Sequence, residues 1–171
     1  MNKINILLMI LIFSNSISNA QPWKTIIIND EVSVNFPSLP IKKEIQGKEM
    51  YFYRAEDYAL MVGVAIKVFS DSSSQLKQQN SGEIKPADTF LSQVINGKIA
   101  HGNQILLSTK TVKIGNHIGK EIAYLTSDSK ERFCFLLLTK DTLYTFECWY
   151  LKKNIKPNEK ETFFNSILVK E

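Results

Sequence analysis

The residues of this chain whose type and spacing are best suited to chemistry are its two cysteines, Cys134 and Cys148. They lie in the stretch RFCFLLLTKDTLYTFECWY, whose apolar runs on either side of a short polar break predict a β-hairpin. If the chain turns at residues 140–142, Thr139 faces Leu143 and Cys134 faces Cys148. Directly opposite residues have Cβ atoms about 4.5–5.5 Å apart, which is near the spacing of about 3.5–4.5 Å that a disulfide requires. A loop one residue shorter or longer would instead place the two thiols on opposite faces of the hairpin.

Three roles remain open for the cysteine pair: a disulfide that staples the hairpin, two buried free thiols, or a redox or metal centre. A redox pair is usually a close Cys-X-X-Cys. A structural zinc ion needs four ligands, and only His101 and His117 could join the cysteines, neither at ligand spacing. The disulfide is the favoured interpretation, because disulfides persist outside the cytoplasm and the N-terminus, described below, predicts export.

The remaining polar residues show no catalytic pattern. The sequence has no HExxH, GxSxG, P-loop or glycine-rich dinucleotide turn. His117, in GNHIG, and His101, in AHGN, are interpreted as exposed turn histidines, and an enzyme would need one of them to meet a carboxylate in a cleft. Glu56, Asp57 and Asp71 do not form the oxygen-rich series that a Ca²⁺ loop requires. We therefore predict no cofactor and no metal ion.

A mixed aromatic and basic stretch, CWYLKKNIKPNEK, follows the second cysteine. Trp149 with Lys152, Lys153 and Lys156 could form a surface that docks an acidic partner or an anionic surface. The alternative is that the aromatic side chains pack in the sheet while the lysines keep the end of the strand solvated.

The first 20 residues have the order of a secretory signal peptide. Lys3 precedes an apolar run at residues 4–13, and small residues end at Ala20, after which we expect cleavage. The apolar run is too short to span the ~30 Å core of a bilayer as a helix, although an uncleaved anchor remains the alternative. We expect residues 1–20 to be removed and residues 21–171 to form a single exported domain, periplasmic or secreted, without a transmembrane segment.

The charge distribution argues against a nucleic-acid partner. Lys and Arg number 21 against 17 Asp and Glu, and both signs are interspersed along the chain. Nucleic-acid-binding proteins usually concentrate basic residues in a patch, whereas arginine occurs here only at Arg54 and Arg132.

Hydrophobic periodicity indicates which elements must position these residues. Alternation at Val32, Val34 and Phe36 predicts a strand with one buried face, and the apolar run 58–69 predicts a central strand buried on both faces. A helix is expected from Pro86 to a stop at Asn96–Gly97. A second helix is expected near the C-terminus, where Phe163, Phe164, Ile167 and Leu168 form a core-facing stripe. The sum is an α+β domain of mostly antiparallel strands.

Five stretches occur in an order that resembles the PsbP-like superfamily, which includes the extrinsic photosystem proteins and the Ran-binding Mog proteins. They are VSVNFPSLP, YFYRAEDYALMVGVAIKVF, GNHIGKEI, ERFCFLLLTKDTLYTF and FFNSI. The resemblance covers residues 24–169 and is closest to small exported bacterial members. It implies an antiparallel sheet flanked by helices, an α/β/α sandwich, and a protein that acts by binding other proteins or stabilising an assembly. The paired cysteines are not part of that pattern.

Our expectation is an exported, non-catalytic binding or accessory protein with a protein partner in the cell envelope. The partner would contact an exposed sheet face or the lysine-rich C-terminal region. The alternative is a carrier of a small ligand or lipid, with an apolar cavity between the sheet and the central helix lined by Phe90, Val94 and Phe163. The same three residues would otherwise be ordinary core.

Overall fold

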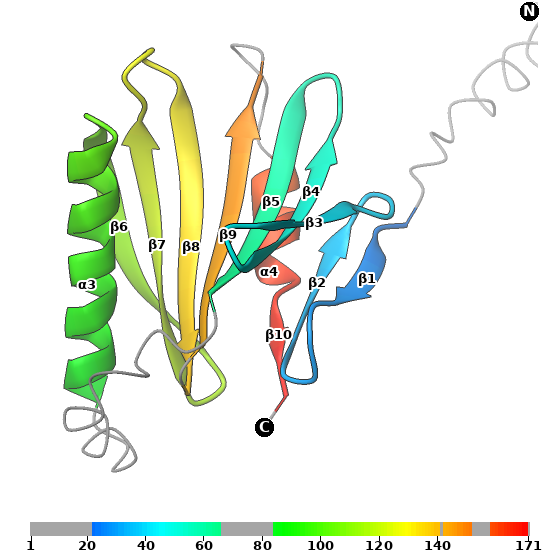
Figure 1. Ribbon diagram of the computed structural model, residues 1–171, viewed down its shortest axis with the longest axis horizontal. Helices are drawn as coiled ribbons and strands as arrows, with labels where there is room; N and C mark the ends of the chain where they lie inside the picture. The colour runs from blue at the N-terminus through cyan, green and yellow to red at the C-terminus, as the bar shows by residue number, and fades with distance from the viewer. Residues whose placement is uncertain (1–21, 66–83, 141, 152–157, 171) are drawn as a thin grey trace, which may run out of the picture.

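Two antiparallel sheets and two helices make up the residues described by the computed structural model, which are 22–65, 84–140, 142–151 and 158–170. The larger sheet has seven strands in the order β3-β4-β5-β9-β8-β7-β6, and the smaller has three in the order β1-β2-β10. The elements are β1 (Lys24–Ile27), β2 (Val32–Phe36), β3 (Ile41–Ile45), β4 (Lys48–Arg54), β5 (Tyr58–Ala65), α3 (Ile84–His101), β6 (Ile105–Ile114), β7 (His117–Leu125), β8 (Glu131–Thr139), β9 (Thr142–Tyr150), α4 (Asn158–Asn165) and β10 (Leu168–Val169). Figure 1 shows α3 at one side of the large sheet and the small sheet at the other.

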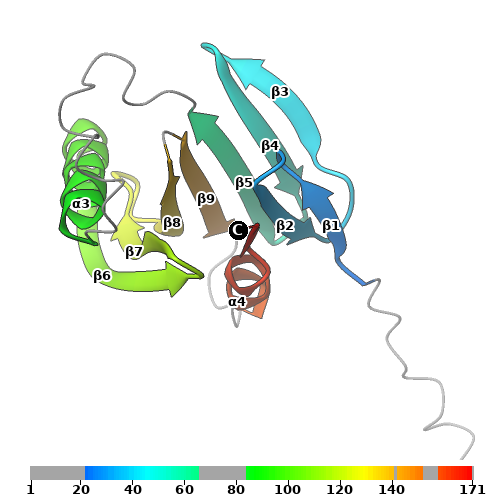
Figure 2. The same ribbon diagram turned by 90° about the horizontal axis from the view of Figure 1, so that it is seen from below.

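The two faces of the large sheet are covered differently. Helix α3 packs on one face against β6, β7 and β8, where Leu91 and Ile95 are buried against the sheet. The opposite face is covered by α4 and the small sheet, and Figure 2 shows the two helices on opposite sides. The predicted α+β class with an antiparallel sheet is confirmed. The expected helix-flanked sandwich is only partly right, because a second sheet shares one face with a short helix.

The small sheet exists because β2 has the predicted alternation. Val32, Val34 and Phe36 are all nearly inaccessible to solvent, whereas Ser33 and Asn35 are half-buried. A strand with one wholly apolar face must cover something apolar, and β2 covers the aromatic side chains of β9 and α4. The described part of the apolar run 58–69 differs from the prediction, since β5 mostly alternates between buried and half-buried residues; residues 66–69 lie outside the described residues. The strand that is buried almost throughout is β8.

The hairpin of β8 and β9 has a register that differs from the predicted one. Thr139 pairs with Thr142, so only two residues separate the paired strands, and the first of them, Lys140, adopts a left-handed φ of 47°. Cys134 therefore lies opposite Glu147, and Cys148 lies opposite Phe133. Because successive side chains point to opposite faces, Cys134 enters the cluster under α3 and Cys148 enters the cluster under α4. The predicted disulfide is wrong: both cysteines are free and buried.

Both thiols should consequently react only after the protein unfolds. Burial raises the pKa of the Cys148 thiol to about 12 and raises that of Cys134 as well, so neither forms a thiolate at neutral pH. Without reductant, we expect two thiols per chain to react with a chromogenic disulfide reagent in concentrated guanidinium chloride, and almost none in native buffer. Finding no reactive thiol in the denatured protein would contradict the observed register.

Helix α3 continues beyond its predicted stop. It runs through Asn96 and Gly97 to His101 and ends where Asn103 takes a positive φ of 47°. A glycine inside a helix costs only about 1 kcal/mol relative to alanine, and packing of Ile99 against the sheet compensates for it. Likewise Leu168, predicted in a helical stripe, lies in β10 with 61% of its surface exposed. No helix in the described part of the chain is long and apolar enough to span a bilayer.

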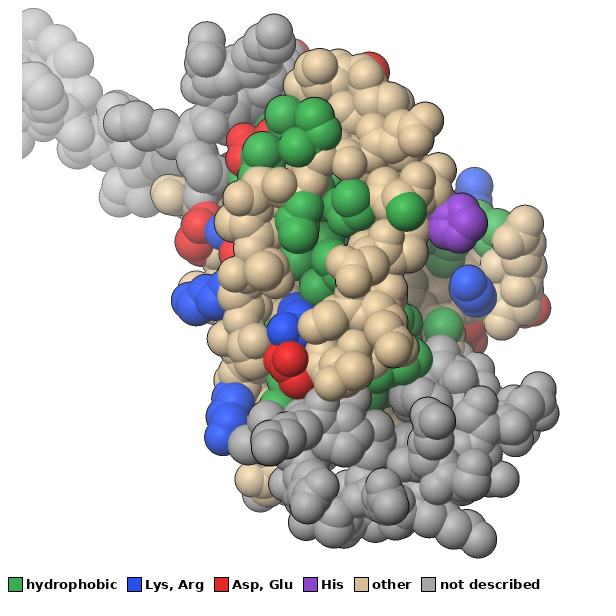
Figure 3. Space-filling model, turned by 90° about the vertical axis from the view of Figure 1, so that its left-hand side faces the viewer, with side chains coloured by type: hydrophobic (Ala, Val, Ile, Leu, Met, Phe, Trp, Pro, Cys, Tyr) green, Lys and Arg blue, Asp and Glu red, His purple; other side chains and the backbone are tan. Residues whose placement is uncertain are grey.

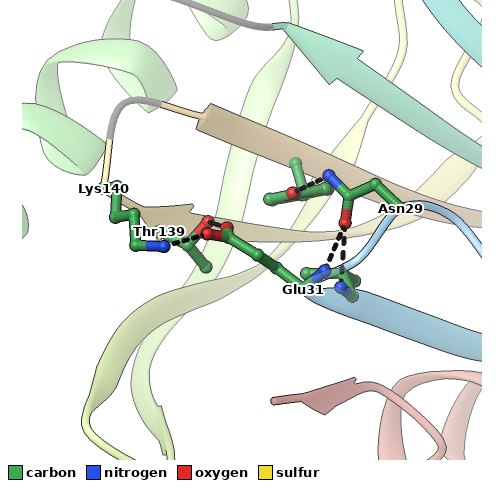
Figure 4. Close-up of polar contacts among 6 residues, drawn as sticks. Asn29, Glu31, Thr139 and Lys140 are labelled. Carbon is green, nitrogen blue, oxygen red and sulfur yellow. Dashed lines mark hydrogen bonds and ion pairs between the residues drawn. The ribbon is translucent and has the colours of Figure 1, made fainter. Parts of the chain in front are cut away.

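A polar network joins the small sheet to the β8–β9 turn (Figure 4). Asn29 accepts hydrogen bonds from the amides of Glu31 and Val32 and donates one to the Tyr144 hydroxyl. The Glu31 carboxylate accepts hydrogen bonds from Thr139 and from the Lys140 ammonium group. These contacts fix the orientation of the small sheet on the large one.

The Glu31→Gln variant should be less stable than the natural protein by about 1 kcal/mol at pH 7. The hydrogen bond from Lys140 holds the pKa of Glu31 below its ordinary value of 4.5. Its stabilising contribution is therefore present above the unfolded pKa and is lost as pH falls through the folded pKa. Urea unfolding at several pH values should show the difference shrinking on acidification. Glu131→Gln, an exposed change at the start of β8, serves as the control for the change in net charge and should alter stability by less than about 0.5 kcal/mol at pH 7.

Candidate functional site

The tryptophan that the sequence singled out, Trp149, lies near the end of β9 on the face of the large sheet that α3 partly covers. Its neighbours in register are Ala59 on β5 and Arg132 on β8. The Arg132 guanidinium lies 4.9 Å from the centre of the indole ring, and the Phe52 ring lies 6.1 Å from it. A stacked guanidinium contributes about 0.5–1 kcal/mol at an exposed site, so Trp149 is held between a cation and an aromatic ring and stays half-buried.

The two arginines of the chain lie in one row across the sheet, on either side of Trp149. The row follows the register Arg54, Ala59, Trp149, Arg132, Tyr124 through β4, β5, β9, β8 and β7. Residues directly opposite in adjacent strands share a face. Antiparallel pairing therefore brings Arg54 and Arg132, which are far apart in the sequence, to the same surface.

Helix α3 leaves part of this face uncovered by any other described element. The helix contacts β6, β7 and β8, whereas β3, β4 and β5 present partly buried or exposed apolar side chains on the same face. These are Ile41, Ile45, Met50, Phe52 and Met61. Ile41 is 59% exposed and Ile45 is 48% exposed, so the uncovered area is apolar as well as aromatic.

The charges on this area are almost all positive. Lys43 and Lys48 point to the same side as the two arginines, by the alternation of β3 and β4. Among the described residues, none of these four cations forms an ion pair with a carboxylate. The carboxylates of the same two strands point to the opposite side, where Glu49 pairs with Lys42 at 2.9 Å. We call this surface the Trp149 face: Ile41, Lys43, Lys48, Met50, Phe52, Arg54, Met61, Arg132 and Trp149.

One carboxylate borders the Trp149 face, but its charge is already neutralised. Glu147 is 5% exposed, and its Oε1 lies 2.6 Å from Nζ of Lys98 on α3. Burial by itself would lower the pKa of Lys98, yet attraction to Glu147 outweighs burial and raises it. Burial raises the pKa of the neighbouring Tyr124 to about 12. The pair is thus a fixed structural contact that holds α3 at the border of the Trp149 face.

Of the predicted interaction surface, the structure describes only Trp149. Lys152, Lys153 and Lys156 lie outside the described residues. The structure adds Arg54, Phe52 and the lysines of the β3–β4 hairpin, which sequence reasoning missed. No local signal connects that hairpin with Trp149, because only the pairing of β4, β5 and β9 brings them together.

The residues predicted to line a carrier cavity do not lie together. Phe90 and Val94 pack under α3 on one face of the large sheet, whereas Phe163 packs from α4 on the other. That set is corrected, because the two helices occupy opposite layers. On the α3 side of the molecule, hydrophobic side chains are visible at the surface (Figure 3).

The two histidines lie apart from the Trp149 face and from each other along the fold. His101 is the exposed last residue of α3, and His117 is half-buried at the start of β7. His117 lies near Glu31, whose pKa is lowered chiefly by the hydrogen bond from Lys140 and whose carboxylate also accepts a hydrogen bond from Thr139. Within the described ranges, His, Cys, Asp and Glu form no group of three or more that could hold a metal ion.

Comparisons with known proteins show similarity at the level of the fold. A scan against models of protein families and a search of curated proteins each found no match. Among solved structures, the chain is similar to the solution structure of cyanobacterial PsbP (CyanoP) from Synechocystis sp. PCC 6803. That match has 14% sequence identity and a TM-score of 0.53 and covers 91% of this chain and 96% of that one. The antiparallel sheet, its two helices and this full-length match together identify a PsbP-like fold.

Proposed function

We propose that this protein is an exported, non-catalytic accessory protein that binds another protein through the Trp149 face. The observation that carries the proposal is the combination of a tryptophan held by Arg132 and Phe52 with exposed apolar side chains on β3, which pairs with the strand of Phe52. Tryptophan and arginine are the residue types that most often dominate binding energy at protein interfaces. Exposed apolar groups gathered with them are characteristic of interaction surfaces.

The arrangement suits binding because the sheet holds these side chains in place before a partner arrives. Trp149 and Arg132 lie on paired strands in the middle of the large sheet, and each restrains the other through the stacking contact. Side chains that are ordered in the free protein lose little conformational entropy on association. The leader-like N-terminus supports a location outside the cytoplasm for this binding.

Site-specific photocrosslinking in the producing cell tests the binding face. We expect a photoreactive phenylalanine analogue at position 41, on the Trp149 face, to give a discrete cross-linked protein product. The matched control has the analogue at position 27 in the small sheet, where Ile27 is 66% exposed compared with 59% for Ile41. A product from position 27 with none from position 41 would refute the proposed face, as would identical products from both.

Export is tested on the same culture. We expect the protein in the envelope or extracellular fraction, with an N-terminus at Gln21 after cleavage behind Ala20. Recovery of the chain in the cytoplasmic fraction with its leader intact would contradict the proposal.

A further inference from the structure

We infer that the segment bound by the Trp149 face is an acidic amphipathic peptide segment of the partner protein, in which carboxylates accompany apolar side chains. The inference rests on the proposed function and specifies the chemistry of its partner. It is carried by the charge and the shape of the surface, both of which the structure places on one side of the large sheet.

The charge argument begins with four cations that lack carboxylate partners in the described part of the chain: Lys43, Lys48, Arg54 and Arg132. The only carboxylate on the same side of these strands belongs to Glu147, which is buried and bound to Lys98. Elsewhere several described lysines do pair with acidic side chains, as Lys120 on β7 pairs with Asp88 on α3 at 2.7 Å. A concentration of one charge sign attracts the opposite sign and suppresses other partners.

A second observation is the unsatisfied state of Arg132. Its Nε is buried and has no hydrogen-bond acceptor in the protein, although buried polar groups are almost always hydrogen-bonded. The guanidinium carbon lies 4.9 Å from the centre of the Trp149 ring. Arg132 as a whole is only half-buried, so its terminal N–H groups, and not the buried Nε, are the donors for a planar acceptor. A carboxylate is the acceptor that matches this geometry, because it can take two parallel N–H bonds from arginine.

The apolar part of the Trp149 face indicates which other side chains the partner peptide carries besides carboxylates. Phe52, Met50 and Met61 are half-buried between the cations, and Ile41 and Ile45 are exposed beside them. A purely acidic ligand would leave these groups in contact with water, whereas apolar side chains of a peptide would cover them at about 25 cal/mol per Å² of buried area. The matching segment therefore alternates acidic and apolar residues.

The arrangement of the elements favours a peptide segment over a membrane surface. Helix α3 and the β3–β4 hairpin both extend from the same side of the large sheet, one on each flank of β9 and β5 (Figure 2). A flat bilayer would meet these two elements before it reached β5 and β9, the second of which carries Trp149. A single peptide segment is narrow enough to contact the row directly.

Equilibrium binding to the full mature chain tests the inference. The probe is a short fluorescein-labelled peptide of alternating Glu and Leu, and the matched probe has Gln in place of Glu. We expect anisotropy to show binding of the Glu peptide that weakens steeply with added salt, and binding of the Gln peptide that is at least about tenfold weaker, a difference of about 1.4 kcal/mol.

Two double variants with the same change in net charge locate the contact. Arg54→Gln with Arg132→Gln should weaken binding of the Glu peptide about tenfold or more. Lys110→Gln with Lys113→Gln removes two exposed cations from β6, away from the Trp149 face, and should change binding less than about twofold. Circular dichroism and thermal unfolding of all variants exclude a folding defect as the cause.

Several results would overturn the inference. Equal losses in the two double variants would mean that only net charge matters, and equal binding of the Gln peptide would mean that carboxylates are not recognised. Arginine-dependent binding to vesicles of phosphatidylglycerol and phosphatidylcholine, without binding of the Glu peptide, would identify a membrane surface instead. A protein cross-link from position 41 in cells without any binding of the Glu peptide would overturn this inference and leave the proposed function standing.

Discussion

Replacing Phe163 with alanine should lower the free energy of unfolding by about 4 kcal/mol, the largest effect that we expect from one substitution. Phe163 is wholly inaccessible to solvent. Its ring centre lies 5.2 Å from that of Phe36 on β2 and 6.3 Å from that of Phe146 on β9. One side chain thus joins α4, the small sheet and the large sheet, and its removal leaves a cavity where these three parts of the fold meet.

Chemical denaturation of Phe163→Ala, followed by circular dichroism, measures this effect. Phe163→Leu should recover part of the loss, because it restores much of the buried volume. The control Leu168→Ala lies five positions further along the chain at an exposed site, and should change stability by less than about 0.5 kcal/mol. A loss below about 1 kcal/mol for Phe163→Ala would mean that α4 does not pack as described.

Replacing Lys98 with methionine should lower the free energy of unfolding by about 3 kcal/mol, because the buried Glu147 carboxylate loses its cationic partner. Methionine keeps the apolar stem that packs near Tyr124, so the loss reports mainly the missing charge. The pKa of Lys98 is raised on folding, so its contribution is complete below its ordinary pKa of 10.5 and disappears only as pH rises through the folded value. The destabilisation should therefore be fully present at neutral pH.

The double variant Lys98→Met with Glu147→Leu distinguishes the effect of a buried unpaired charge from that of a general packing defect. Replacing both members of a buried ion pair with apolar residues is often neutral or stabilising, so this variant should regain most of the lost stability. The control Lys130→Met removes one member of an exposed pair, whose side chains are 61% and 54% accessible, and should change stability by less than about 0.5 kcal/mol. A double variant as unstable as Lys98→Met would refute the role assigned to the pair.

The contact between Lys98 and Glu147 also bears on the Trp149 face. It holds the C-terminal half of α3 against the sheet beside Trp149 and neutralises the one carboxylate that borders the cations. Losing the pair should therefore weaken binding of the acidic peptide even under conditions where the variant remains folded. The same anisotropy titration measures this effect, and unchanged affinity would show that the border of the face plays no part in recognition.

Sequence patterns predicted the helices and strands that are specified by residues close together in the sequence. Period-two alternation identified β2, and the helix predicted from Pro86 to Gly97 lies within α3. Phe163 and Phe164 were correctly expected to be buried. These predictions succeed because the periodicity of apolar residues reflects the geometry of each element and the single face that it buries.

The end of α3 and the cysteine pairing show where local evidence fails. Gly97 predicts the end of a helix, but contacts with residues far away in the sequence stabilise the additional helical turn after Gly97. The hairpin register depends on whether the turn contains two residues or three, and the polar break allows both. A change of one residue moves each side chain to the other face, and here it separates Cys134 from Cys148 by the thickness of the sheet.

The sequence by itself determined the α+β class, several of the strands, the two helices and the order of motifs that resembles the PsbP-like fold. Only the tertiary structure decided that the thiols are separated, that Phe163 and Phe90 belong to different layers, and that both arginines flank Trp149. The physical reason is that hydrophobic patterning specifies which side of an element is buried. Strand order and register, which are set by pairing between distant segments, decide which side chains meet on the surface.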